Sequence, residues 1–179
     1  MSGSRNDALI QLCQQLLPHD VSLVDEVKLA IEQPTHFAAQ FRGNLSGRGI
    51  YEPRPSLPWI ALIDGLIERN CCREIDWKEA PKDVMAAIDD LLPDQPHGPN
   101  RWTWVDLQTW DNSSTEDFLD VIAHHLHDEG KVLAYLDHDS DSFALIILEP
   151  SRFRESEYLA RQAGYGELVP WSDGAVENP

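Results

Sequence analysis

The sequence predicts an α+β fold, in which a small mixed or antiparallel sheet with a central hairpin packs against several helices and the N-terminal third is all helical. Two apolar runs, Val132–Leu136 and Phe143–Leu148, are separated by an insert rich in Asp and Ser, which is the pattern of a β-hairpin. The second run contains no polar residue, so we expect this strand to be covered on both faces inside the sheet.

Helix boundaries are marked by capping residues and prolines at the starts, and by glycine or proline at the ends. The expected helices are Asp7–Leu17, one from Ser22 to just before Pro34, a short one from Thr35 or His36, Trp59–Asn70, Pro81–Leu92, Glu116–Glu129 and Ser151–Ala163. The segment Gly43–Pro58 has three Gly and three Pro, and is predicted to be the longest irregular stretch.

Short strands are expected outside the hairpin as well. The expected segments are Cys72–Trp77, Arg101–Leu107 and Glu167–Trp171. Trp102 and Trp104 would then lie on one face of their strand, because alternate strand residues do. Of the six tryptophans, most are expected in the core, and Trp110, which precedes Asp-Asn-Ser-Ser, is expected at the surface.

A chain of 179 residues is expected to form a single domain. Its parts are a helical N-terminal part and loop at 1–57, an α+β core at 58–172 and a frayed tail at 173–179. The Pro-rich residues 93–100 are expected to form a surface loop. Three cysteines without a Cys-x-x-Cys spacing support neither a structural zinc site nor a disulfide scaffold. Because no apolar signal segment leads the sequence, the expected compartment is the cytoplasm.

The charge of the chain is strongly negative, with 31 acidic and 14 basic residues and a net charge of −17. Residues 1–90 carry 14 acids and 9 bases (−5), whereas residues 91–179 carry 17 acids and 5 bases (−12). No Lys or Arg occurs between Trp102 and Gly130. A field of this sign repels phosphate backbones and anionic lipids, so we expect no nucleic-acid or membrane binding. A basic protein is the expected partner, and a purely solubilising role is the alternative.

The hairpin insert carries Asp137, Asp139 and Asp141, which match the first three oxygen ligands of an EF-hand loop. The match then fails, because Ser142 stands where the loop needs Gly and Leu148 where it needs Glu. A looser Ca²⁺ or Mg²⁺ site on the three carboxylates remains an alternative, and no other cofactor is expected. The competing interpretation is a solvated turn in which Asp and Ser bond their own backbone.

A second polar cluster follows one face of the predicted helix Glu116–Glu129. At helical spacing this face presents Asp117, Asp120, His124, His127 and Asp128. Two histidines three residues apart are zinc ligands in some proteins, but the His-Glu-x-x-His motif is missing. A solvated polar face is therefore the favoured interpretation, with His124 and His127 kept as candidate metal ligands.

Catalytic motifs are missing, since the sequence has neither Gly-x-Ser-x-Gly nor a recognisable Cys–His pattern, and no catalytic residue is predicted. Asp64, Asp76 and Asp106 lie among apolar neighbours, where a shifted carboxyl pKa is expected. Capping of the following loop is the alternative for Asp76 and Asp106. A small-ligand pocket is a further alternative, with Arg48 and Arg54 of the irregular stretch holding an anion.

Three short motifs resemble an uncharacterised bacterial family, the domain of unknown function 6630. They are Ile75-Asp76-Trp77-Lys78-Glu79 before a helix, Leu136-Asp137-x-x-Ser140-Asp141-Ser142-Phe143 in the hairpin, and Ala163-Gly164-Tyr165 at the end of the closing helix. The resemblance spans about Trp59 to Pro170. It implies a bacterial cytoplasmic protein and brings no activity, ligand or catalytic residue with it.

Together these observations favour an uncharacterised bacterial protein acting as a non-enzymatic acidic interaction module, immunity-like or regulatory, that binds a basic protein. The expected contact residues lie at the hairpin tip, on the acidic helix and at the tryptophan before that helix: Asp137, Asp139, Asp141, Ser142, Asp117, Asp120 and Trp110. The alternative is a metal-dependent enzyme or small-ligand-binding domain that uses the acidic hairpin tip.

Overall fold

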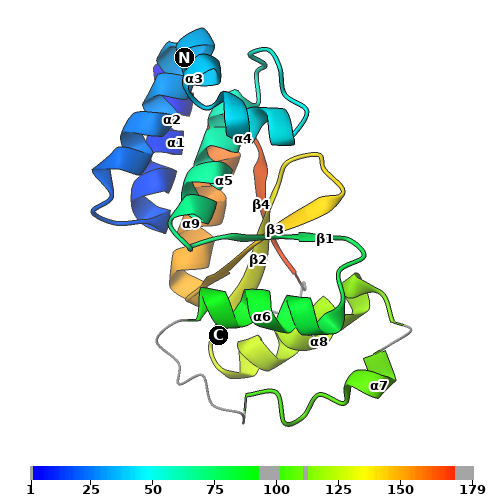
Figure 1. Ribbon diagram of the computed structural model, residues 1–179. Helices are drawn as coiled ribbons and strands as arrows, with labels where there is room; N and C mark the ends of the chain where they lie inside the picture. The colour runs from blue at the N-terminus through cyan, green and yellow to red at the C-terminus, as the bar shows by residue number, and fades with distance from the viewer. Residues whose placement is uncertain (1, 93–100, 111–112, 172–179) are drawn as a thin grey trace.

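The computed structural model describes residues 2–92, 101–110 and 113–171, and within them it has nine helices and four strands (Figure 1). The strands are antiparallel, in the order β1-β3-β2-β4. The hairpin of β2 (Val132–Asp137) and β3 (Ser142–Leu148) lies between β1 (Arg73–Asp76) and β4 (Glu167–Pro170). The predicted α+β fold with a central hairpin is therefore confirmed. The expected loop at 93–100 and tail at 173–179 lie outside the described residues.

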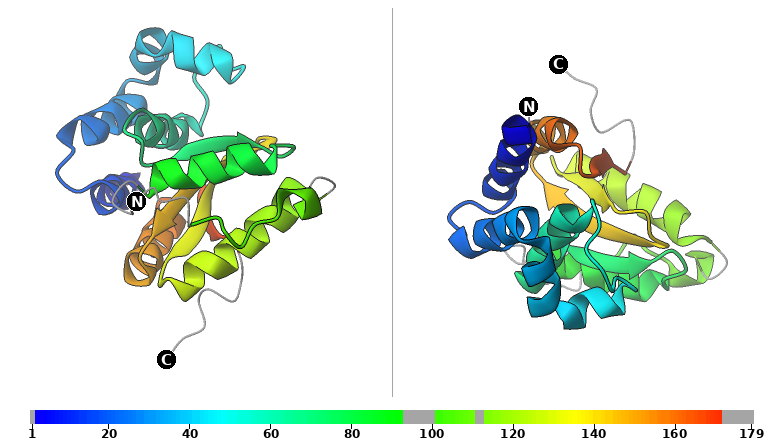
Figure 2. Two further views of the ribbon diagram at one scale, coloured as in Figure 1. Left: turned by 60° about the horizontal axis from the view of Figure 1, so that its bottom comes forward. Right: turned by 90° about the horizontal axis from the view of Figure 1, so that it is seen from above.

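Helices cover both faces of the sheet (Figures 1 and 2). The core on one face joins the sheet to α5 (Leu57–Glu68) and α9 (Pro150–Ala163), and α1 (Ser2–Leu16) and α2 (Val21–Glu32) add to it by packing on α9 and α5. The other face packs against α6 (Pro81–Leu91) and α8 (Thr115–Asp128). Alternate residues of β2 divide between the two cores: Ala134 belongs to the first, and Leu133 to the second. This double cover explains why β3 has an unbroken apolar run.

The N-terminal third is helical, as predicted, but two starts differ from expectation. Helix α1 begins at Ser2 rather than Asp7, and Arg5 donates to the Ala163 carbonyl of α9 at 2.5 Å. The part of α1 that precedes Asp7 is therefore held against α9 by this hydrogen bond. Helix α2 is capped by Asp20 rather than Ser22, because the Asp20 carboxylate accepts from the Leu23 N–H at 2.8 Å.

Residues 43–58 are not entirely irregular, because α4 (Arg42–Gly47) follows α3 (Pro34–Gln40) directly and extends into this segment. Its glycines argue against a helix on propensity alone. The contacts of Leu45 outweigh this low helix propensity, because its side chain is buried and its carbonyl accepts from the Ile50 N–H at 2.8 Å. The remaining irregular segment, residues 48–56, contributes to the site described below.

The prediction of a strand at Arg101–Leu107 is wrong: these residues form turns that lead into a short helix, α7 (Leu107–Trp110). The two tryptophans contact helices instead of a neighbouring strand. Trp102 donates to Asp89 at 3.0 Å, and the Trp104 ring lies 4.8 Å from that of His125. Because two-residue spacing also arises in turns, it did not distinguish these interactions from strand pairing.

Trp110 was expected at the surface, and this prediction is wrong too. Its ring is half-buried, 5.1 Å from the ring of Phe118. The exposed tryptophan is Trp77, with 47% of its surface accessible. No helix in the described part of the chain is both long and apolar enough to cross a membrane.

Candidate functional site

A charged cluster forms where the 48–56 segment, strand β1 and the hairpin tip meet. Its members come from five places in the sequence and are partly or largely buried: Arg48, Asp64, Glu74, His138 and Ser142. The antiparallel register of β1 and β3 places Ser142 opposite Asp76 at the start of β3. We call these five residues the polar cluster.

Arg48 is the centre of the polar cluster, although its side chain is only 16% exposed. Its Nε donates to Asp64 at 2.7 Å, while Nη1 and Nη2 donate to the two carboxylate oxygens of Glu74 at 3.0 and 2.6 Å. The paired, forked geometry is the strongest that a guanidinium and a carboxylate form. The charge of Arg48 is therefore already paired with two carboxylates inside the protein.

Glu74 also accepts from the other side of the polar cluster. The Ser142 hydroxyl donates to its Oε1 at 2.5 Å, and His138 Nε2 lies 3.2 Å from the same oxygen. The Nδ1 of His138 faces the Leu136 carbonyl at 3.1 Å. Since both ring nitrogens face oxygens that accept, the doubly protonated imidazolium is the form that satisfies this geometry.

The pKa values of the polar cluster follow from these contacts. Hydrogen bonding to Glu74 raises the pKa of His138, against the opposing effect of burial. Burial alone would raise the pKa of Glu74, but hydrogen bonds from His138, Arg48 and Ser142 outweigh it and hold that pKa well below its usual range. At Asp64 burial prevails, and its pKa is raised despite Arg48. The expected shift at Asp64 is thus present.

Ser142, His138 and Glu74 do not form a hydrolytic triad. In a triad the serine and the acid contact opposite nitrogens of the histidine, which then takes the serine proton. Here Ser142 and Glu74 both lie on the Nε2 side, and the serine proton is donated to Glu74. With a strongly lowered pKa, Glu74 is also a poor base. The arrangement supports structure and electrostatics rather than serine activation.

The cysteines are not activated either. Burial raises the pKa of Cys13 to about 12, and it also raises the pKa of Cys71 and of Cys72. The thiol, which is a weak nucleophile, is the favoured form of all three at neutral pH.

The hairpin aspartates are exposed and form a local turn. Asp137 accepts from the Asp139 N–H at 3.2 Å, and Asp139 has a left-handed φ of 55°, which Asp tolerates better than most residues. Within the described residues, no three or more His, Cys, Asp or Glu side chains are grouped so that they could hold a metal ion. Asp137, Asp139 and Asp141 therefore do not converge as ligands.

The polar face predicted for α8 is at the surface: Asp117, Asp120, His124 and His127 are all exposed. Asp117 completes a capping box with Ser114, and His124 Nδ1 bonds the Asp120 carbonyl at 2.8 Å. Neither histidine belongs to a group of candidate metal ligands in the described part of the chain.

Asp76 and Asp106 cap the loops that follow them, which is the alternative suggested by their positions at the ends of predicted strands. Asp76 accepts from the Lys78 N–H at 2.8 Å, and Asp106 accepts from the Gln108 N–H at 3.0 Å. Each bond closes a turn over two residues, which is the usual role of aspartate there.

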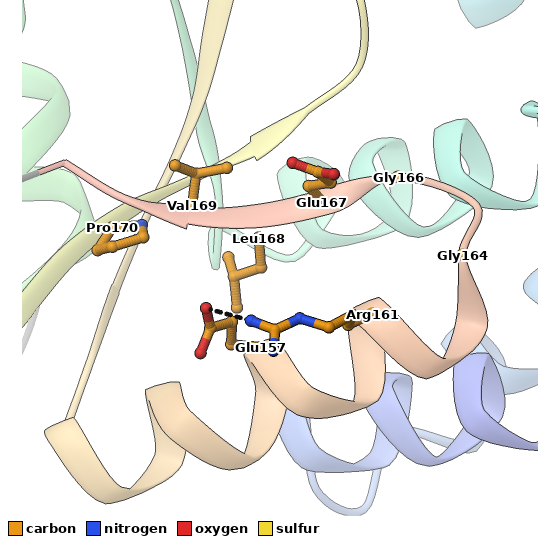
Figure 3. Close-up of a pocket in the computed structure, with 8 residues that line it drawn as sticks. All are labelled: Glu157, Arg161, Gly164, Gly166, Glu167, Leu168, Val169 and Pro170. Carbon is orange, nitrogen blue, oxygen red and sulfur yellow. Dashed lines mark hydrogen bonds and ion pairs between the residues drawn. The ribbon is translucent and has the colours of Figure 1, made fainter. Parts of the chain in front are cut away.

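Three surface depressions lie near the β4 end of the molecule and the hairpin tip. One, of about 330 Å³, separates α9 from β4; of its three charged side chains, Glu157 and Arg161 pair with each other at 3.0 Å, and the third is Glu167 (Figure 3). The other two, of about 430 and 320 Å³, lie beside the polar cluster and have Arg54, Ile60, His138 and Asp139 in common.

Comparison with known families agrees with the resemblance in the hairpin. A family model described as a domain of unknown function, DUF6630, matches residues 8–170. The chain belongs to this family. The DUF6630 match extends beyond the motifs at 59–170 to the N-terminal helices, and it contains every residue of the polar cluster. No curated protein and no solved structure matches the chain.

The sequence predicted part of the polar cluster. It singled out Arg48, Asp64 and Ser142, but it missed Glu74 and His138, which are 64 residues apart in the chain. Two signals in the sequence could have indicated them: Glu74 alternates with the buried Ile75 in its strand, and His138 lies inside the hairpin motif.

Proposed function

We propose that the DUF6630 chain is an interaction module, immunity-like or regulatory, that binds a basic protein partner. Its binding surface would be on the α8 side of the sheet, where three aromatic side chains adjoin three carboxylates. We call Tyr135, Phe143 and Trp171 the aromatic cluster, and Asp137, Glu167 and Glu116 the acidic rim.

The aromatic cluster gathers rings from neighbouring strands. The Tyr135 centroid lies 5.9 Å from Phe143 and 5.5 Å from Trp171, and the last two rings are 4.9 Å apart, all in edge-to-face contact. All three residues are half-buried, so part of each remains accessible. Aromatic side chains that are rigidly packed and partly exposed are common anchors of protein interfaces.

The acidic rim supplies the observation that carries this proposal. Asp137 and Glu167 lie directly opposite each other on β2 and β4, and both are exposed. Like charges at opposed positions destabilise a sheet. Burial, followed by the charges of Asp137, Glu167 and Glu116, raises the pKa of Tyr135.

The acidic rim has no internal counterion among the described residues, since none of its three carboxylates is in an ion pair there. A lysine or arginine from a partner, placed between Asp137 and Glu167, would relieve their repulsion and contact the aromatic cluster. The exposed Asp117 and Asp120 of α8 extend the negative field beyond Glu116.

Affinity capture with a charge-neutralised variant tests the proposal. The wild-type chain is immobilised in extract of its own cell at low salt, beside Asp137→Asn/Glu167→Gln and the charge-matched control Asp25→Asn/Glu32→Gln. Both control positions are exposed residues of α2. We expect a basic protein retained by the wild type and the control and lost by the rim variant. The rate at which this basic protein associates with the wild-type chain should fall about tenfold or more with added salt.

Two outcomes would contradict the proposal: equal capture by all three proteins, or a captured partner whose association rate does not respond to salt. Folding of the rim variant is checked by thermal unfolding, where relief of the Asp137–Glu167 repulsion predicts unchanged or higher stability. Loss of capture by a protein at least as stable as the wild type cannot then be attributed to unfolding.

A further inference from the structure

The two depressions beside the polar cluster adjoin each other and form one groove, which Asp137 and Glu167 of the acidic rim also border. They share Arg54, Ile60, His138 and Asp139, so the same side chains border both. Volumes of about 430 and 320 Å³ are within the range of small-molecule sites. We call this the tip groove.

The floor of the tip groove is apolar and closely packed. Ile60 and Trp59 are buried, and the Trp59 indole N–H donates to the Asp137 carbonyl at 2.7 Å. Gly166 lies against the same indole so closely that an added Cβ would overlap the ring. The indole is therefore held in one position between α5, the hairpin and the start of β4.

The walls of the tip groove are held by the polar cluster. Arg48 connects the 48–56 segment to Glu74 of β1, and Glu74 in turn binds His138 and Ser142 of the hairpin tip. Because each wall is fixed to the same partly buried carboxylate, the groove is preformed rather than created by a ligand.

Opposite charges face this preformed space. Arg54 is exposed, and it makes no hydrogen bond or ion pair with its side chain among the described residues. Asp139 is also exposed and is outside every ion pair of the described residues. The two border both depressions, yet no ion pair joins them. A free cation, Arg54, thus borders the same apolar floor as several free carboxylates, Asp139 among them.

We propose that the tip groove binds a small zwitterion of the amino-acid class, with its carboxylate on Arg54 and its ammonium group on Asp139. A simple anion would meet Arg54 but be repelled by the exposed carboxylates that line the groove (Asp137, Asp139, Asp141 and Glu167), and a simple cation would leave Arg54 without a counterion. A ligand with both charges satisfies both sides, and its methylene groups cover Ile60. The forked guanidinium is well suited to a carboxylate.

Matched probes test this assignment directly. The ¹⁵N-labelled chain is titrated with ω-amino acids from glycine to 6-aminohexanoate, and with the carboxylate and the amine of equal length for each. We expect at least one member of the series to bind at least tenfold more tightly than its two single-charge counterparts. Amide shifts should concentrate at Arg54, His138 and Asp139.

Variants connect the binding to the two charges. Arg54→Gln and Asp139→Asn should each weaken the best probe at least tenfold, and Asn tolerates the left-handed φ of residue 139. Arg42→Gln, at an exposed arginine of α4 outside the tip groove, should leave binding unchanged. The proposal is overturned if the whole series fails to bind, if a single-charge probe binds as tightly as its zwitterion, or if Arg54→Gln binds like the wild type.

Discussion

Arg48 donates two hydrogen bonds to the two carboxylate oxygens of Glu74, at 3.0 and 2.6 Å, and so fastens the segment after α4 to the edge strand β1. Replacing Glu74 leaves the partly buried Arg48 with Asp64 alone as its carboxylate partner, and removes the charged acceptor that faces His138. We expect Glu74→Gln to lower the free energy of unfolding by about 2–4 kcal/mol. Urea denaturation followed by circular dichroism measures it.

The control for this variant is Glu52→Gln, an exposed carboxylate in the same irregular segment. A surface change of this kind alters stability by no more than about 0.5 kcal/mol. If Glu74→Gln were as mild as Glu52→Gln, the polar cluster would not be holding the 48–56 segment in place.

Protonation of His138 should stabilise the fold. Its pKa is raised above the ordinary value of 6.5, chiefly by the hydrogen bond to Glu74. The folded state therefore binds the proton more tightly than the unfolded state does, so the stabilisation is complete below about pH 6.5 and is lost as pH rises through the folded-state pKa. The loss of stability caused by His138→Gln should be largest at low pH within this window.

Urea denaturation at a series of pH values, with an NMR titration of the His138 ring, measures this dependence. His124→Gln is the matched control, because His124 is an exposed histidine of α8. A folded-state titration of His138 below 6.5, or a stability difference that grows with pH, would refute the imidazolium assignment.

The sequence predicted those parts of the fold whose signals are local. The unbroken run Phe143–Leu148 identified the central strand, and Ser114 and Gly130 marked the two ends of α8. The polar cluster depends instead on contacts such as Glu74 with His138, which no short pattern encodes. Trp110 was placed wrongly for the same reason: its neighbours in sequence are polar, but Phe118 covers its ring.

Neutralising one member of the acidic rim should stabilise the protein. Because Asp137 and Glu167 are directly opposed and exposed, Asp137→Asn is expected to raise the free energy of unfolding by about 0.2–1 kcal/mol. Glu167→Gln should then raise the free energy of unfolding less in the Asp137→Asn background than in the wild type, since the repulsion has already been removed. Thermal unfolding of the two single variants and the double variant measures this coupling, and strict additivity would show that the two charges do not interact.

Gly166 is required by the close approach of Trp59. A methyl group at residue 166 would overlap the indole, which is fully buried and donates to the Asp137 carbonyl. Forcing this ring to move strains the core, so Gly166→Ala should cost about 1–3 kcal/mol.

Gly43→Ala is the control for this substitution. No atom lies within 4 Å of a Cβ added at Gly43, which is inside α4. Replacement of a helical glycine by alanine there should stabilise the chain by up to about 1 kcal/mol. Opposite signs for the two variants in urea denaturation would show that Gly166 is needed for space and not only for backbone freedom. Because Trp59 and Gly166 both line the tip groove, Gly166→Ala should also weaken the best ω-amino acid probe, whereas Gly43→Ala should not.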